Sequence, residues 1–240
     1  FLLSTLLAGM KNENGKVTIP NYYGDAPLSE ETKQVLRDIP IDETALLARL
    51  GVAKSESVGG NYYESISLPS LNINGLSAAS TTAVRTIIPA SATASIDIRT
   101  TKEAHSSRQV KLLKDYITAK GYHIVDELPS KETRLKHEKL ILIEVSPGTA
   151  ALQTSLDEPV GLWAQKALES VSDEKVVVIP MMGGTVPTAP LVNSIEKPVI
   201  LIPLVNADNN QHAPNENLRI GNFYSGTNAL YQLLTTPYAQ

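Results

Sequence analysis

Cysteine is absent from this 240-residue sequence, so disulfide bonds and thiolate metal sites are excluded, and any metal must be held by histidine and carboxylate side chains. An excess of positive charge is also missing: 21 Lys and Arg stand against 25 Asp and Glu, which gives a formal net charge of −4. Because binding of a phosphate backbone needs a basic face, we expect no nucleic-acid partner. No apolar run comes near the roughly 18 residues of a membrane-spanning helix, so we expect no membrane insertion.

The first ten residues, Phe1 to Met10, place leucines at helical spacing without an initiator methionine or a basic segment ahead of them. A signal peptide needs that basic segment. The pattern favours an amphipathic helix entered part-way, so we expect the chain to be the C-terminal part of a longer protein. A natural start at a frayed helix is the alternative. We predict that the protein is cytoplasmic.

Hydrophobic periodicity divides the chain near residue 150. In the first part we expect helices over 1–10, after a Ser29 cap, after an Asp42 cap, and over 102–120, the last of these closed by Gly121. We expect strands over 67–74, 92–99, 123–128 and 140–145. The long helix should bury Val110, Leu113, Tyr116 and Ile117. We expect the strands to pair as antiparallel neighbours, which gives a compact α+β layer.

The second part has a different texture. A helix should open at Asp157-Glu158-Pro159, where acidic residues and proline suit a first turn. The continuous apolar runs 176–179 and 199–202 are typical of parallel strands buried on both faces, and a last helix is expected over 218–234. This order predicts an α/β segment that makes only half of a doubly wound sheet.

The stretch 206–216 follows one of these apolar runs and contains His212 among polar residues. Open α/β sheets place ligands at the carboxyl ends of strands, so His212 is a candidate metal ligand. The alternative is a surface loop histidine. The three other histidines, His105, His123 and His137, are interpreted as surface residues.

Two further stretches suggest anion binding. Gly183, Gly184 and Thr185 also follow an apolar run, and paired glycines let backbone N–H groups approach an anion closely. A simple turn is the alternative. Arg99 ends a predicted strand, and its guanidinium could clamp a carboxylate through two hydrogen bonds. From the residues alone, a solvated strand-end arginine is the favoured interpretation.

Together these stretches resemble the carnosinase and aminoacylase type of di-zinc metallopeptidases. This family includes carnosine-type dipeptidases, acetylornithine and succinyl-diaminopimelate deacylases, and glutamate carboxypeptidases. The resemblance is carried by Leu71–Leu76, Arg85–Ala90 and Ile96–Arg99 for the lid domain, by Gly183–Pro187 for a Gly-Gly-Ser-Ile-Pro loop, and by Asp208–Glu216 for the last metal-ligand motif. The spacings of 13 residues from Thr86 to Arg99 and 27 from Thr185 to His212 also fit.

The resemblance implies a fold and an activity. Residues 1–150 would form an α+β lid and dimerisation domain whose start is missing, and residues 151–240 the C-terminal part of a split α/β catalytic domain of zinc-exopeptidase type. The full-length parent would be an enzyme that hydrolyses a dipeptide or a related amide with a free carboxylate. Two bound zinc ions, or other divalent metals, would hold the attacking water, with a glutamate as general base.

The resemblance also assigns roles to residues. His212 would bind one of the two metals, and Arg99, Gly183, Gly184 and Thr185 would hold the substrate carboxylate. Thr86 would reach the active site of the neighbouring subunit in a homodimer paired through the lid domains.

The sequence departs from the family where most of the catalytic groups are expected. The first His-x-Asp motif, the bridging Asp, the paired Glu, a further carboxylate ligand and the lid His do not occur in it, and Ser146-Pro147-Gly148 replaces the His-Gly-Gly of many relatives. The chain by itself is therefore expected to contain no catalytic residue, to bind little zinc and to be inactive. Deacylation of N-acyl amino acids, within the same family, and a non-catalytic dimerisation module remain as alternatives.

Overall fold

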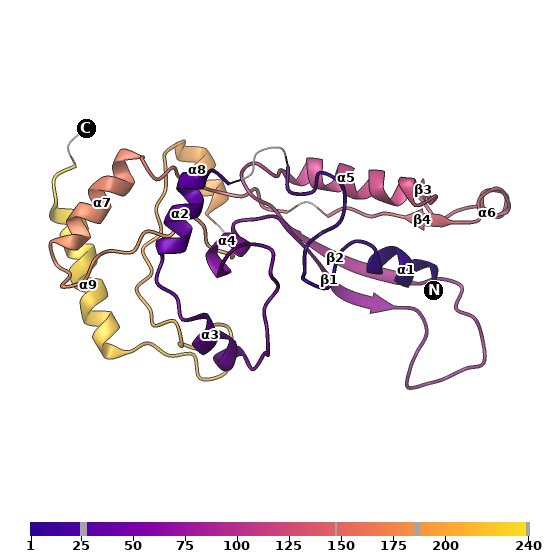
Figure 1. Ribbon diagram of the computed structural model, residues 1–240, viewed down its shortest axis with the longest axis horizontal. Coiled ribbons are helices and arrows are strands. Elements are labelled where there is room, and N and C mark those ends of the chain that lie inside the picture. Colours follow the sequence, from indigo (N-terminus) through magenta and orange to yellow (C-terminus); the bar gives the residue numbers. More distant parts are fainter. Residues whose placement is uncertain (25–27, 147, 185–187, 239–240) are drawn as a thin grey trace. The chain divides into compact units, whose positions relative to one another are not determined.

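The computed structural model describes residues 1–24, 28–146, 148–184 and 188–238. Its elements, in chain order, are α1 (Leu2–Ala8), α2 (Glu30–Asp38), α3 (Glu43–Leu50), α4 (Tyr62–Ile66), β1 (Ser70–Ser77), β2 (Thr93–Arg99), α5 (Ser106–Ala119), β3 (His123–Val125), α6 (Lys131–Lys136), β4 (Leu140–Leu142), α7 (Pro159–Glu169), α8 (Ala189–Ile195) and α9 (Ile220–Thr235) (Figure 1). They form two compact units. Unit 1 comprises Phe1–Leu152 and Met181–Thr185, and unit 2 comprises Gln153–Pro180 and Val186–Gln240. Among the described residues, no helix combines the length and the apolar character that crossing a membrane requires.

Strands β1 and β2 form an antiparallel pair in which Leu71 lies opposite Ile98 and Leu76 opposite Ala94. The predicted end of β1 at Gly75 is wrong, because the register shifts between Ile73 and Gly75 and the strand continues to Ser77. Asn74 is thus an extra residue, and this bulge keeps Leu76 on the same face as Leu71. The predicted apolar face of β2 is confirmed, since Ala94, Ile96 and Ile98 pack against the core of unit 1.

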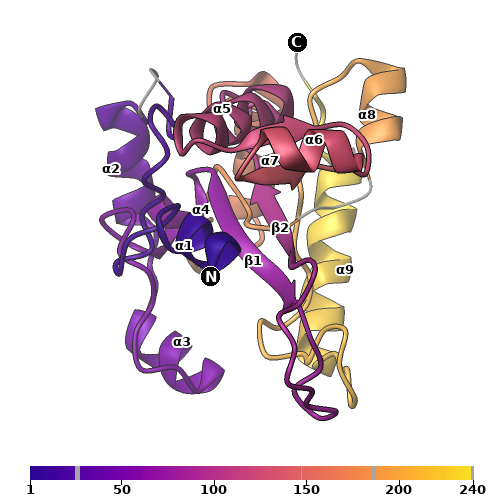
Figure 2. The ribbon, with the colours of Figure 1, turned by 90° about the vertical axis from the view of Figure 1, so that its right-hand side faces the viewer.

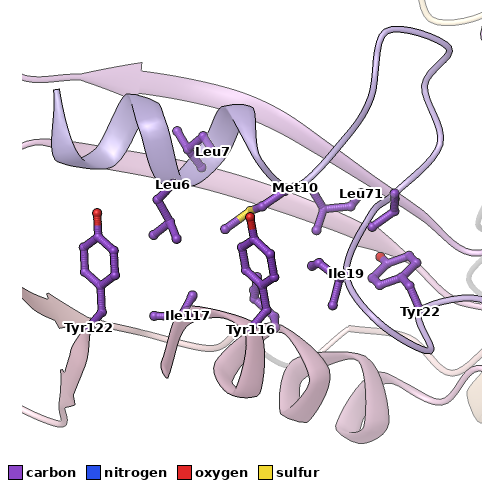
Figure 3. Close-up of a cluster of buried hydrophobic side chains, with 11 residues drawn as sticks. Leu6, Leu7, Met10, Ile19, Tyr22, Leu71, Tyr116, Ile117 and Tyr122 are labelled. Atoms are coloured by element: carbon purple, nitrogen blue, oxygen red, sulfur yellow. The ribbon is translucent and has the colours of Figure 1, made fainter. Parts of the chain in front are cut away.

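The core of unit 1 joins the first helix to the strands. It contains Leu6, Leu7 and Met10 from the α1 region, and Leu113, Tyr116 and Ile117 from α5. The other members are Val17, Ile19, Tyr22 and Leu71, which lie between these helices, and Tyr122, which follows α5. Figure 3 shows Tyr116, Ile117 and Tyr122 directed toward Leu6 and Met10. Both helices lie close to β1 and β2 (Figure 2). The amphipathic pattern at the start of the chain is therefore a core-forming helix.

Helix α5 differs in two details from the prediction. It starts at Ser106 rather than Lys102, because the hydroxyl of Thr101 accepts the N–H of Ala104 at 3.2 Å and shapes a turn ahead of the helix. Val110 is only half-buried, whereas Gln109 is fully buried and donates from Nε2 to the carbonyl of Tyr22 at 3.0 Å. The predicted end at Gly121 is confirmed by its left-handed φ of 82°.

Strands β3 and β4 are parallel, so the predicted antiparallel pairing is wrong here. Helix α6, capped by the hydroxyl of Ser130, lies between them, and such a crossover brings the second strand back in the direction of the first. The rings of His123 and His137 stack with a centroid distance of 3.8 Å. His105 and His123 are exposed, as expected, but His137 is half-buried.

The predicted helix caps are confirmed. The side chain of Ser29 accepts the N–H of Thr32 at the start of α2, and that of Asp42 accepts the N–H of Ala45 at the start of α3. The short helices α4, α6 and α8 were not predicted. Five to seven residues repeat a hydrophobic period at most once, and only the leucine-rich start of the chain made so short a pattern recognisable.

Unit 2 is built on α7 and α9, which bury Ala164, Ala167 and Leu233 between them. The predicted strands at 176–179 and 199–202 are not formed, because neither run has a neighbouring strand among the described residues. Instead, the hydroxyl of Thr154 accepts the N–H of Val199 at 3.2 Å and donates to its carbonyl. Only Ile200 and Ile202 of that run pack against the helices.

Tyr22 is a buried residue of the core that makes a polar contact with β1. It is 1% exposed, and its hydroxyl donates to the carbonyl of Ser70 at 2.9 Å. Burial, and then the nearby Tyr23 and Asp97, raise the pKa of Tyr22 far above 10.0. A raised pKa in the folded state means that this group's stabilisation is complete below pH 10 and is lost as the pH rises above it.

Replacement Tyr22→Phe should lower the free energy of unfolding by about 1 kcal/mol at pH 7, because the carbonyl of Ser70 loses its donor. Above pH 10 the difference from wild type should shrink, since the variant has no phenol to ionise at this position. Urea unfolding at pH 7 to 11 measures both effects. Tyr231→Phe, at an exposed position on α9, is the control. A difference that stays constant with pH would contradict the role of the buried phenol.

Candidate functional site

The loop that carries His212 is closed at its base by Asn206. This side chain is 5% exposed, and its Nδ2 donates to Asp208 Oδ1 at 2.9 Å and to Asn217 Oδ1 at 3.3 Å. Its Oδ1 accepts the backbone N–H of Arg219, at the start of α9, at 3.1 Å. One buried amide therefore joins the two ends of the loop.

Further hydrogen bonds run across the loop. The backbone N–H of Asn217 donates to the carbonyl of Asn209 at 2.9 Å, and that of Ala213 donates to the carbonyl of Asn210 at 2.9 Å. Outside the loop base, Arg219 Nη2 lies 2.6 Å from Asp208 Oδ2 in a largely exposed ion pair. The loop is thus organised by its own polar groups.

Three residues of the loop have left-handed backbones without being glycine: Asn210 at φ 53°, His212 at 63° and Asn215 at 64°. Asparagine and histidine tolerate this region better than most residues, but such a conformation still costs about 1 kcal/mol or more and persists only where the surroundings impose it. The cross-loop hydrogen bonds supply that constraint. The loop therefore fixes the backbone at His212.

His212 is exposed, and its ring takes part in no hydrogen bond to another described residue. An exposed imidazole with an uncommitted nitrogen suits one position in a metal site. Within the described parts of the chain, however, no group of three or more His, Asp or Glu side chains converges on a point. His212 thus fits as one ligand, and these residues do not complete a metal site.

Arg99 ends β2 and is already held on one side. Its Nε donates to Asp97 Oδ2 at 2.6 Å, and its side chain remains 55% exposed. The two residues lie on the same face of the strand, two positions apart. A guanidinium has five N–H donors in a planar fork, so the Asp97 contact leaves the terminal amino groups directed elsewhere. Asp97 therefore fixes one edge of the guanidinium, while the side chain remains exposed.

Thr86 lies in the irregular segment between β1 and β2. All residues from 83 to 90 are exposed, and Val84, Ile87 and Ile88 are exposed apolar side chains within it. The segment joins β2 at Thr93, whereas Arg99 is at the other end of this strand, about 20 Å away at the usual rise per residue. The segment that contains Thr86 therefore meets the sheet at the end of β2 remote from Arg99.

Gly183 and Gly184 belong to unit 1 with Arg99 and Thr86, whereas His212 belongs to unit 2. Neither glycine has a positive φ, and a Cβ at Gly183 would make ordinary contact with Ile66 at 3.6 Å. At Gly184 no atom of the described residues, its chain neighbours aside, lies within 4 Å of such a Cβ. Within the described part of the structure there is thus no steric reason for two glycines, and their role in anion binding stays a prediction. Thr185 lies outside the described residues.

Residues 2–125 match the family model of the M20 peptidase dimerisation domain. The Cys-Gly metallodipeptidase DUG1 of Saccharomyces cerevisiae is 26% identical over 93% of this chain and 45% of its own length. The human Beta-Ala-His dipeptidase is 24% identical over 94% of the chain and 43% of its own length. The chain thus spans a little under half the length of these curated relatives.

Solved structures agree with this likeness at the level of the fold. An M20 family metallo-carboxypeptidase from Sulfolobus solfataricus superposes with a TM-score of 0.72 at 22% identity, over 97% of this chain and 51% of that one. The yeast dipeptidase Dug1p superposes with a TM-score of 0.66 at 24% identity, over 97% of this chain and 47% of that one. The mixed α and β fold expected from the sequence is confirmed. Because the family match covers more than half of its residues, the chain belongs to the M20 peptidases and carries their dimerisation domain.

Proposed function

We propose that the intact protein containing this chain is a metal-dependent hydrolase of dipeptides or related amides with a free carboxylate. By intact protein we mean a polypeptide of the relatives' full length. The observation that carries the proposal is the closed loop that presents an exposed His212, in a stretch whose sequence resembles the family's last metal-ligand motif. The activities named for the yeast and human relatives support the substrate class.

In this proposal His212 is one ligand of a two-metal site, with zinc as the expected metal. Further ligands come from residues outside those that this structure describes. When bound, two divalent ions polarise an amide carbonyl and lower the pKa of a bound water. The contribution of this chain's own residue is an imidazole on a loop that is closed by its own hydrogen bonds.

Arg99 is proposed to bind the substrate carboxylate. The side chain is exposed, positively charged and oriented by Asp97, which suits a bidentate contact. Backbone N–H groups of Gly183 and Gly184, and the hydroxyl of Thr185, are proposed to add donors to the same group. These two sets of donors explain why a free carboxylate is expected on the substrate.

Thr86 is proposed to act in the neighbouring subunit of a homodimer. Its segment is exposed and lies at the end of β2 remote from Arg99, which is what a contribution to another subunit's site requires. The family's dimerisation domain covers this segment. The assignment of residues 1–150 as the lid, of 151–240 as part of the catalytic domain, and of a cytoplasmic location stays a prediction.

Two alternatives are separated by measurements on the intact protein. A deacylase would prefer N-acyl amino acids over dipeptides in a side-by-side panel. A dimerisation module would bind no zinc and hydrolyse neither class. The dipeptidase proposal is preferred because the curated relatives reported above are named as dipeptidases.

The 240-residue chain by itself should bind fewer than two zinc ions tightly and hydrolyse dipeptides far more slowly than the intact protein. A catalytic zinc takes three protein ligands, and the described residues hold no group of three. Elemental analysis of dialysed protein and a dipeptide turnover assay test this. Two tightly bound zinc ions and turnover equal to that of the intact protein would show that the chain is sufficient.

Replacement Arg99→Ala in the intact protein should raise KM for substrates with a free carboxylate by roughly 10- to 150-fold, because a charge-assisted hydrogen bond worth about 1.5–3 kcal/mol is lost. Substrates amidated at that end should be affected much less. Arg134→Ala, at an exposed position on α6, is the matched control. Equal losses on both substrate types would mean that Arg99 has only a structural role.

Replacement His212→Ala in the intact protein should remove a metal ligand and leave the fold intact, since the side chain is exposed. Metal affinity should fall by more than the roughly 10–100-fold that loss of an outer-shell partner costs, and activity should fall with it. Bound zinc per subunit, thermal unfolding and turnover are measured together. His105→Ala, an exposed histidine at the N-cap of α5, is the control. A His212 variant that keeps two zinc ions and normal turnover contradicts the metal assignment.

A further inference from the structure

We propose that Asn206 is a positioning residue for His212: its buried side-chain amide fixes the loop so that the imidazole is held ready for the metal. This inference rests on the proposed function. Asn206 itself touches neither metal nor substrate in this role. It acts through the loop that it closes.

The hydrogen bonds of Asn206 are directed entirely at the loop base. Its two donors reach Asp208 and Asn217, and its acceptor takes the N–H of Arg219. At 5% exposure, the amide cannot exchange these partners for water without opening the loop. The segment from Asp208 to Asn217, which contains His212, is therefore tethered at both ends to one side chain.

The backbone of His212 is the part that needs this tether. A left-handed histidine relaxes to a commoner conformation when its loop is free, and the imidazole then points in another direction. Metal ligands must be held close to the productive geometry to bind tightly, so a relaxed loop costs affinity. Loss of the tether should thus weaken metal binding before it weakens the fold.

A purely structural role for Asn206 fits the packing less well. The core of unit 2 consists of Ala164, Ala167 and Leu233, with Trp163, Leu168, Ile200 and Ile202 against it, and none of the partners of Asn206 is among them. The amide joins the two ends of the loop to each other and to the start of α9. Its removal should therefore leave the helix pair in place.

An exchange of side chains across the hydrogen bond tests the proposal in the intact protein. In N206D two carboxylates face each other where an amide donated to Asp208 at 2.9 Å, so zinc affinity should fall by about 10–100-fold. In the double variant N206D/D208N the new Asn at 208 donates to the new Asp at 206, which still accepts the N–H of Arg219. The double variant should recover most of the affinity at unchanged net charge.

Zinc alone is the probe, with affinity measured by competition with a chelator and the fold followed by thermal unfolding of the metal-free protein. N228L, at an exposed asparagine on α9, and the wild type give the reference. N217A removes the second acceptor of Asn206 and should lower affinity by a few-fold; it replaces N206D if that variant does not fold. In each folded variant kcat should fall while KM changes little.

The outcomes separate the two proposals. Wild-type zinc affinity in both N206D and N217A, with His212→Ala deficient in zinc, overturns the positioning role and leaves the metal assignment standing. A double variant as weak as N206D also overturns it, since the restored hydrogen bond would then be irrelevant. Retention of both metals by His212→Ala means that the proposed function itself has failed.

Discussion

Unit 1 depends on the burial of a helix too short to be stable alone. Helix α1 has seven residues, which is well under the length at which isolated helices persist in water. Its leucines and Met10 are held by Tyr116 and Ile117 of α5 and by the strands. The hydroxyl of Tyr122 adds a hydrogen bond to the carbonyl of Leu2 at 2.8 Å. Tertiary packing, rather than helix propensity, therefore creates this element and joins the two ends of the family-matched region.

The helix caps, the end of α5 and the buried face of β2 were predicted correctly because each depends on local chemistry. A serine or aspartate that caps a helix, or a glycine that ends one, acts on neighbours within a few residues, so Ser29, Asp42 and Gly121 were recognisable. The alternation in β2 likewise reports which face is buried. These features need no knowledge of distant partners.

The sequence did not predict which strands pair with one another, or in which direction. The parallel arrangement of β3 and β4 follows from α6, which is too short to produce a periodic pattern. The apolar run at 199–202 reads as a buried strand, yet in the described residues its backbone partner at Val199 is the hydroxyl of Thr154, 45 residues earlier. An extended segment is a strand only when another strand is beside it.

The candidate site shows the same division. His212 and Arg99 were identified by residue type and motif, whereas the residues that orient them were not. Asp97 is two positions from Arg99 and gives no signal beyond alternation, and Asn206 reads as an ordinary polar residue after an apolar run. Burial is what makes Asn206 informative, and burial is a property of the folded loop. In both places the polar partner becomes recognisable only in the folded chain.

The extra residue in β1 has a consequence for the segment that follows it. A bulge bends its strand and increases the local right-handed twist, so Asn74 changes the angle at which the chain leaves the sheet after Ser77. The exposed segment with Thr86 begins at that point. The direction in which this segment leaves the sheet is thus set outside the segment, by the geometry of β1 a dozen residues before Thr86. Insertion or deletion of one residue in a strand can therefore change the direction of the segment that follows, while the sequence of that segment stays the same.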